Sequence, residues 1–251
     1  MRSLSKLALI GMVALSGCAV IQKPIPASPA LFTDRESTVA VVMTKMPEPA
    51  ARMTGAQGIL DIAINRGLAK PIVERLQKQD FSTVAALPKK MAEGLESRQM
   101  KTVLIQEPLD VATMSQFTEG SGDGIARLDY RPLAKRYDAQ RLLVLSPMWL
   151  GTTRAYHGFL PLGAPSGYVA IVGQLVDLKT NKLLWYQSIE SSQFAAGDWD
   201  EAPEYPNLMK AVSSSTDDAA NRLRASLFME GTTPTVASAA AATTTTAAAQ
   251  Q

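Results

Sequence analysis

The chain has one histidine and one cysteine, the residues best suited to acid–base or nucleophilic chemistry. His157 lies in TTRAYHGF. If the protein were a serine hydrolase, this histidine would have to be its general base. The nearest approach to the G-x-S-x-G pattern is GAPSG, residues 163–167, and there the serine comes one place late. A hydrolase that uses His157 is therefore the alternative, and a histidine at a loop or strand end is the favoured interpretation. One histidine and one cysteine also exclude the usual zinc sites.

A second group of reactive side chains lies in GDWDEAPEY, which brings acidic and aromatic residues together. Oxygen-rich clusters can bind calcium, but the spacing of an EF-hand is absent and no metal is expected. The glycine-rich GSGDG at 120–124 lacks the Lys-Ser/Thr of a phosphate-binding loop, so no cofactor is expected either. A solvated acidic loop before a helix is the favoured interpretation. The alternative, which the aromatic rings beside the carboxylates suggest, is a partner-binding surface made of Asp198, Trp199, Asp200, Glu201 and Tyr205.

The single cysteine follows a short apolar run at the N-terminus. Arg2 and Lys6 precede the nine residues of 7–15, an arrangement typical of a secretory signal peptide and too short to span a bilayer. Leu15-Ser16-Gly17-Cys18 resembles the bacterial lipobox, in which the cysteine thiol is acylated and becomes the first residue. We therefore predict that Cys18 is lipidated, and several acyl chains give a stable membrane anchor.

Two further properties follow from this N-terminus. An aspartate after the cysteine commonly retains such lipoproteins in the inner membrane, so Ala19 favours the outer membrane, facing the periplasm. The chain has 25 basic and 23 acidic residues, and removal of Arg2 and Lys6 with the signal peptide makes the two numbers equal. A nucleic-acid partner, which requires a basic face, is not expected. With Cys18 acylated, no thiol remains for a disulfide.

The sequence divides into four parts. Residues 1–17 form the signal peptide, and 18–36, with three prolines after Cys18, are predicted to be the lipidated anchor and a flexible tether. The Ala/Thr-rich tail at 230–251 has no apolar face to bury, so disorder is predicted. The remaining residues, 37–229, are long enough for one domain with a sizeable core.

The hydrophobic patterns within 37–229 predict both helices and strands. Helical spacing covers about 56–79, where Leu60, Ile64 and Leu68 begin a stripe, and also about 82–98, 125–137 and 207–229. Apolar and β-branched runs predict strands at 37–44, 101–105, 141–150, 168–178 and 182–191. Lys179, Thr180 and Asn181 are turn residues, so the last two strands form a hairpin, with Asn181 suited to a positive φ. In the last strand Leu183, Trp185 and Ile189 are expected on one face.

This order predicts an α/β (α+β) fold: a single mixed sheet with crossover helices, then an antiparallel meander and a C-terminal helix. The order, together with DLKTNKLLW at 177–185, resembles a group of Gram-negative periplasmic lipoprotein domains. The group includes the curli-secretion lipoprotein CsgG, the synthase activator LpoB and the N-terminal domain of TolB. The resemblance implies a non-catalytic docking or accessory role in envelope assembly or export, with an unidentified envelope protein as partner. By the same resemblance, association into a homo-oligomer is an open alternative.

Overall fold

Seven strands form one mixed sheet, in which the long central strand β4 (Arg141–His157) pairs with most of the others. The computed structural model describes residues 22–229, so the expected signal peptide, Cys18 and the tail at 230–251 lie outside it. The strand order is β3–β1–β4–β6–β7, and β2 and β5 also pair with β4. The predicted fold class is confirmed.

The early strands are parallel and the late ones antiparallel. β1 (Thr38–Met43) pairs in parallel with β3 (Lys101–Leu104) and with β4, and the chain between β1 and β3 contains three helices. These are α1 (Ile59–Leu76), α2 (Ser82–Ala85) and α3 (Leu87–Glu96). The antiparallel part consists of β4, β6 (Ser166–Asp177) and β7 (Leu183–Phe194), followed by α5 (Pro206–Phe228).

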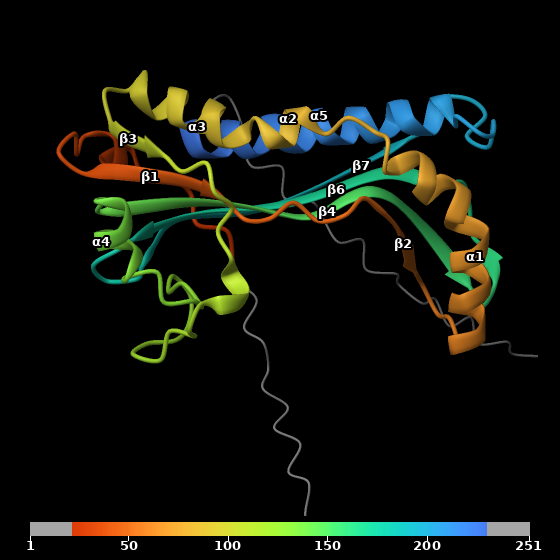
Figure 1. Ribbon diagram of the computed structural model, residues 1–251, viewed down its shortest axis with the longest axis horizontal. Helices are drawn as coiled ribbons and strands as arrows, with labels where there is room; N and C mark the ends of the chain where they lie inside the picture. The colour runs from red at the N-terminus through yellow and green to blue at the C-terminus, as the bar shows by residue number, and fades with distance from the viewer. Residues whose placement is uncertain (1–21, 230–251) are drawn as a thin grey trace, which may run out of the picture.

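One face of the sheet is covered by α2, α3 and α5 (Figure 1). The main hydrophobic core lies here, with Trp185 and Leu223 fully buried. Gly167 on β6 allows the close approach of α5, because a Cβ at this position would overlap the backbone of Ala211. The sheet and its C-terminal helix therefore pack directly, backbone against backbone.

A smaller core lies on the opposite face, beneath β1, β4 and β6. The segment from Ile105 to Ala139 covers it, and this segment contains only short helices, η2 (Val111–Thr113) and α4 (Leu133–Tyr137). The helix predicted over 125–137 is thus limited to its last turn. Before this turn, the side chain of Asn181 holds the backbone by hydrogen bonds to three backbone groups between Ala126 and Tyr130.

Several element boundaries differ from the predictions for identifiable reasons. The strand expected at 141–150 continues to His157, because β2 (Ala50–Thr54) pairs in parallel with its second half. A register shift at the start of β7 places Leu183 in the smaller core, on the other face from Trp185 and Ile189. The expected alternation from Leu183 was therefore wrong at its first residue. The helix predicted at 82–98 is divided into α2 and α3 just before Pro88.

Residues 22–36, which we call the strap, differ from the expected flexible tether. Ile25 exchanges two backbone hydrogen bonds with Tyr186 at the edge of β7. The strap then forms a short 3-10 helix, η1 (Pro29–Phe32), whose Leu31 is buried in the main core. The apolar residues Ile25 and Leu31 thus hold the strap against the domain, although its prolines favour an extended tether. Within the described chain, no helix has the length and apolar character needed to cross a membrane.

Candidate functional site

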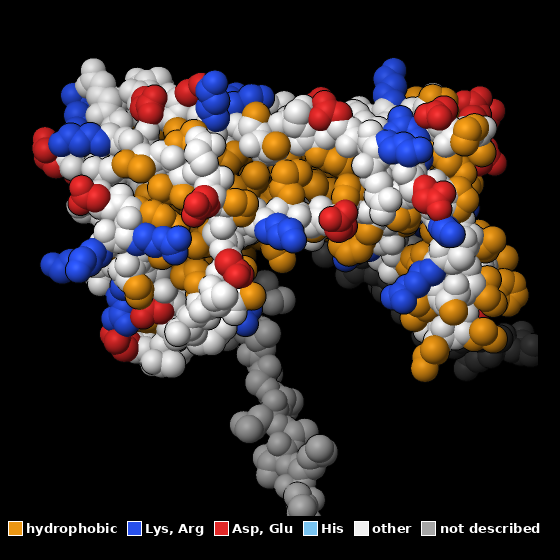
Figure 2. All heavy atoms as spheres, viewed as in Figure 1, with side chains coloured by type: hydrophobic (Ala, Val, Ile, Leu, Met, Phe, Trp, Pro, Cys, Tyr) orange, Lys and Arg blue, Asp and Glu red, His pale blue; other side chains and the backbone are white. Residues whose placement is uncertain are grey.

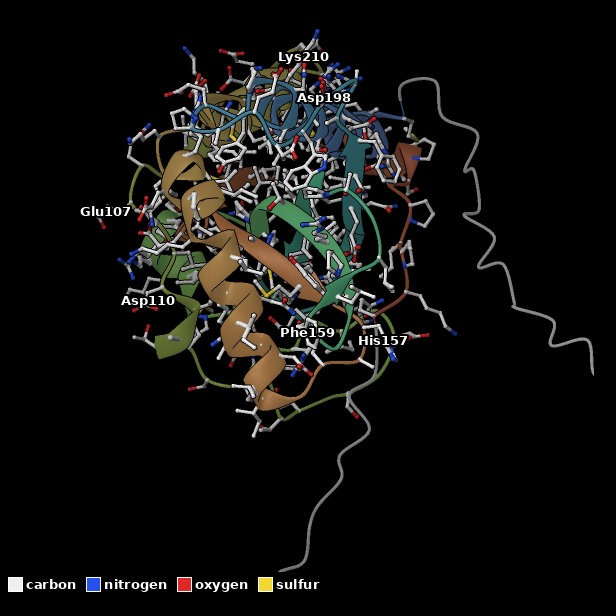
Figure 3. The ribbon with its side chains drawn as sticks, turned by 90° about the vertical axis from the view of Figure 1, so that its right-hand side faces the viewer. Glu107, Asp110, His157, Phe159, Asp198 and Lys210 are labelled. Carbon is white, nitrogen blue, oxygen red and sulfur yellow. The ribbon has the colours of Figure 1, made fainter. Side chains whose placement is uncertain are left out.

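One end of the molecule is built from elements distant in sequence. β2 lies along the second half of β4, with Met53 opposite Arg154, and α1 packs across β2. Gly55, at φ +92°, makes the turn between β2 and α1, where a Cβ would overlap the carbonyl of Tyr156. Figure 3 looks onto this end, with α1 running down beside the strands, Asp198 near the top and His157 and Phe159 near the bottom.

A pocket of about 180 Å³ lies between these elements. Its walls come from α1, β2, β4, the turn that contains β5 (Leu160–Pro161) and the loop before α5. The lining includes Leu68, Ile72, Tyr156, Pro161, Trp199 and Tyr205. Pockets for drug-sized ligands usually measure roughly 300–1,000 Å³. The volume therefore suits one or two side chains of a bound protein better than a cofactor.

Arg154 places a positive charge on the wall of this pocket. Its guanidinium carbon lies 4.7 Å from the ring centroid of Trp199, and its Nε donates a hydrogen bond of 2.6 Å to the carbonyl of Gly163. The stacked ring and the hydrogen bond hold the guanidinium in one orientation. Among the described residues only the Nε–H of Arg154 has a hydrogen-bond partner, so its remaining N–H groups can donate to a carboxylate. The pocket can thus recognise an apolar side chain with a neighbouring acidic group.

The loop that carries Trp199 is fixed at several points. Asn207 donates its side-chain N–H to the carbonyl of Asp198 at 2.9 Å, and the backbone N–H of Tyr205 donates to the carbonyl of Glu201 at 2.8 Å. Tyr205 has a left-handed backbone (φ 46°) at the start of α5 and a buried side chain. Glu204 forms an ion pair with Arg75 of α1, with Oε2 and Nε 3.0 Å apart. These bonds position one wall of the pocket relative to another.

The predicted partner-binding residues divide into two groups. Trp199, Asp200 and Tyr205 line the pocket, whereas the side chains of Asp198 and Glu201 are exposed and outside its lining. Leu68 and Arg154 were missed as site residues. Arg154 is only three positions from His157, but no local pattern distinguishes it, because its importance depends on β4 passing Trp199.

His157 lies apart from this pocket. Its side chain is exposed at the end of β4, near the opposite end of the view in Figure 3 from Asp198. Among residues 22–229, no hydrogen bond or ion pair joins the His157 ring to a serine or a carboxylate. The geometry of a base next to a nucleophile is not formed around it. No cluster of three or more potential metal ligands occurs in the described part of the chain.

No family model matches the sequence, and no curated protein matches it significantly. Among solved structures, a variant PelC dodecamer from Paraburkholderia phytofirmans is 9% identical, covers 77% of this chain and 88% of its own, and has a TM-score of 0.34. The lipoprotein GNA1162 from Neisseria meningitidis is 12% identical, with 74% and 99% covered and a TM-score of 0.32. The LpoB C-terminal domain from Salmonella enterica is 13% identical, with 62% and 83% covered and a TM-score of 0.26. The structural neighbours include bacterial lipoproteins.

Proposed function

We propose that this protein is a lipoprotein anchored in the outer membrane through Cys18, whose periplasmic domain docks a partner protein during envelope assembly or export. The observation that carries the docking role is the pocket in which Arg154 stacks on Trp199. Aromatic and arginine side chains are the residues that most often dominate binding energy at protein interfaces. Here both are already held in place before any partner arrives, which lowers the entropic cost of binding.

The proposed partner contributes an apolar side chain and a carboxylate. The apolar side chain would enter the space between Leu68 and Pro161, and the carboxylate would accept hydrogen bonds from Arg154. Asp200, on the same lining, would disfavour a partner that placed its acidic group on that side. This arrangement requires no nucleophile and no cofactor, in keeping with a non-catalytic role.

Photocrosslinking in intact cells tests the docking role. A crosslinking amino acid at Leu68 should trap a discrete partner, whereas one at Lys90, an exposed residue of α3, should not. Trp199→Ala should abolish the Leu68 crosslink, because it removes the ring that orients Arg154. His157→Ala is the matched control and should leave the crosslink intact. A crosslink that survives both Trp199→Ala and Arg154→Ala would refute the pocket as the docking site.

The anchor is tested separately. Cys18→Ala should prevent incorporation of a fatty-acid probe and leave an unprocessed precursor, and membrane fractionation of the parent protein should place it with the outer membrane. If the Cys18→Ala protein is still processed and fractionates unchanged, the anchoring proposal is wrong. The hydrolase alternative would instead predict a loss of activity of about 10²-fold or more in His157→Ala. No observed contact of His157 favours it.

A further inference from the structure

The outer face of α1 is apolar where a surface helix is normally charged. The exposed residues of its first half include Ile59 and Leu60, which are 91% and 72% exposed, and Ile64. The sequence predicts the stripe through Leu60, Ile64 and Leu68 to be the buried face of the helix. The structure instead buries Asn65, Ala69, Ile72 and Leu76. This half of the stripe therefore points away from the domain.

The turn between β4 and β5 extends the same apolar surface. Phe159, Leu160 and Leu162 are each about three-fifths exposed. The turn is joined to α1, because Asn65 donates a hydrogen bond of 3.1 Å to the carbonyl of Gly158. We call the six residues Ile59, Leu60, Ile64, Phe159, Leu160 and Leu162 the apolar tip. Figure 2 shows hydrophobic side chains gathered over the α1 end of the molecule.

The path of the chain relates this tip to the membrane anchor. Gln22, the first described residue, accepts a hydrogen bond from the backbone N–H of Gly124, and Lys23 pairs with Asp123. This loop and the first turn of α1 both project from the side of the sheet opposite α3 and α5 (Figure 1). Three residues lie between Cys18 and Gln22, and the four residue-to-residue steps can span at most about 14 Å. The proposed anchor would therefore keep this side of the domain close to the bilayer.

We propose that the apolar tip is a second membrane contact, which inserts into the lipid surface that holds the Cys18 anchor. This inference rests on the anchoring part of the proposed function. The side chains of the tip are exposed and offer no hydrogen-bonding groups. The nearby amide of Asn65 is fully buried, and its N–H groups donate to Gln57 Oε1 and to the carbonyl of Gly158.

The charges beside the tip agree with a lipid surface. Arg66 and Lys70 are exposed on α1 and would lie at the level of the lipid phosphates. Asp61 is the acidic residue of the first turn, and its carboxylate accepts a hydrogen bond from the backbone N–H of Gly58 at 2.9 Å. An interfacial helix and an aromatic-tipped turn, added to an acyl anchor, would fix the orientation of the domain as well as its location.

Fluorescence quenching in vesicles tests this contact. Because Cys18 is the one native cysteine and is acylated, Leu60→Cys or Phe159→Cys introduces a unique thiol for an environment-sensitive dye. The acylated protein is reconstituted into vesicles of phosphatidylethanolamine and phosphatidylglycerol that contain nitroxide-labelled lipid. We expect quenching at both positions to be several-fold greater than at Lys90→Cys on α3. Equal quenching at all three positions would overturn the proposal.

A second measurement separates failure of the tip from failure of the anchor. The mature chain with Cys18→Ser, which cannot be acylated, is mixed with the same vesicles and sedimented. Adding Leu60→Ser and Phe159→Ser should weaken vesicle binding by about tenfold or more, because two exposed apolar side chains lose their burial in lipid. Val103→Ser, an exposed apolar residue on β3, should have little effect. If the Cys18→Ser chain binds vesicles equally with and without Leu60→Ser and Phe159→Ser, or if neither form binds, the tip is not a membrane contact. This conclusion holds whether or not Cys18 is acylated.

Discussion

Asn181 illustrates how much one residue can determine in this fold. The turn pattern predicts a positive φ at this position, and the observed φ of 58° confirms it. The sequence does not reveal that the side chain is fully buried. Its Oδ1 accepts from the backbone N–H of Tyr130 at 3.0 Å, and its Nδ2 donates to the carbonyls of Ala126 and Leu128. The hydrogen bonds of this one side chain thus fix part of the segment from Ile105 to Ala139, which contains only short helices.

Asn181→Ala should therefore lower the free energy of unfolding by about 2–4 kcal/mol, since three buried backbone groups lose their partner and alanine tolerates positive φ poorly. Asn181→Gly is the matched control, because it keeps the backbone conformation and loses only the side-chain bonds. Its loss should be smaller by about 1 kcal/mol. Urea denaturation of the three proteins measures both differences. Equal stability of Asn181→Ala and the parent protein would contradict the role given to this side chain.

Tyr130 makes stability depend on alkaline pH. Burial raises the pKa of its hydroxyl to about 12, while a hydrogen bond of 2.7 Å from Gln174 acts in the opposite direction. Since the pKa is raised on folding, this contribution to stability is complete below pH 10 and is lost as pH rises towards 12. The shift corresponds to about 3 kcal/mol. Denaturant titrations from neutral pH to pH 12 should show this fall. Tyr130→Phe should make it less steep without removing it, because burial also raises the pKa of Tyr168 to about 12. An unchanged slope in Tyr130→Phe would assign the pH dependence to other groups.

At the scale of elements, the hairpin of β6 and β7 presents the largest fully buried side chain, Trp185, to α5. The indole ring covers Gly173 on the neighbouring strand, where a Cβ would overlap it. The indole N–H is buried without a hydrogen-bond partner among the described residues. The ring therefore stabilises the fold through its area alone.

Trp185→Ala should lower the free energy of unfolding by about 3–5 kcal/mol, because it leaves a large cavity beneath α5. Trp185→Phe should cost less than about 1.5 kcal/mol, since it keeps most of the apolar volume and removes an N–H that has no partner. Thermal and denaturant unfolding would measure both. A larger loss in Trp185→Phe than in Trp185→Ala would mean that the N–H has a function that the contacts do not explain.

The elements also show what the sequence could predict. β1 and α5 have strong apolar patterns and were placed within one residue of their ends. β2 (AARMT) has no such pattern. All five of its residues are half-buried, and its position depends on its pairing with β4. The same limit applies to the candidate site. Trp199, Asp200 and Tyr205 share one segment and were predicted, whereas Leu68 and Arg154 join them only through the packing of α1 and the pairing of β2 with β4.

At the scale of the whole molecule, the strap packs against both faces of the sheet. The ring centroids of Phe32, in the strap, and Phe228, at the end of α5, lie 6.3 Å apart. The guanidinium of Arg98 lies over both rings. Asp34 pairs with Arg141 at 2.6 Å. Hydrogen bonds from Ser37, together with this guanidinium, lower the pKa of the Asp34 carboxyl. Because the pKa is lowered on folding, the contribution of Asp34 is present above its ordinary pKa and is lost as pH falls through the lowered value.

The strap also determines how freely the domain can move relative to an anchor at Cys18. We expect limited proteolysis of the mature protein to leave a core fragment that begins near Gln22, because cleavage requires the strap to leave the surface first. Leu31→Asp should release it, since a carboxylate cannot be buried in the main core without a partner, and cleavage within 22–36 should become several-fold faster. Ala30→Asp is the matched control, an exposed neighbour in the same short helix, and should leave the fragment unchanged. Mass spectrometry of the fragments identifies the cleavage sites. If the unmodified protein instead yields a core that begins near Ser37, the strap is the flexible tether that its prolines suggest, and the domain is free to tilt away from the membrane.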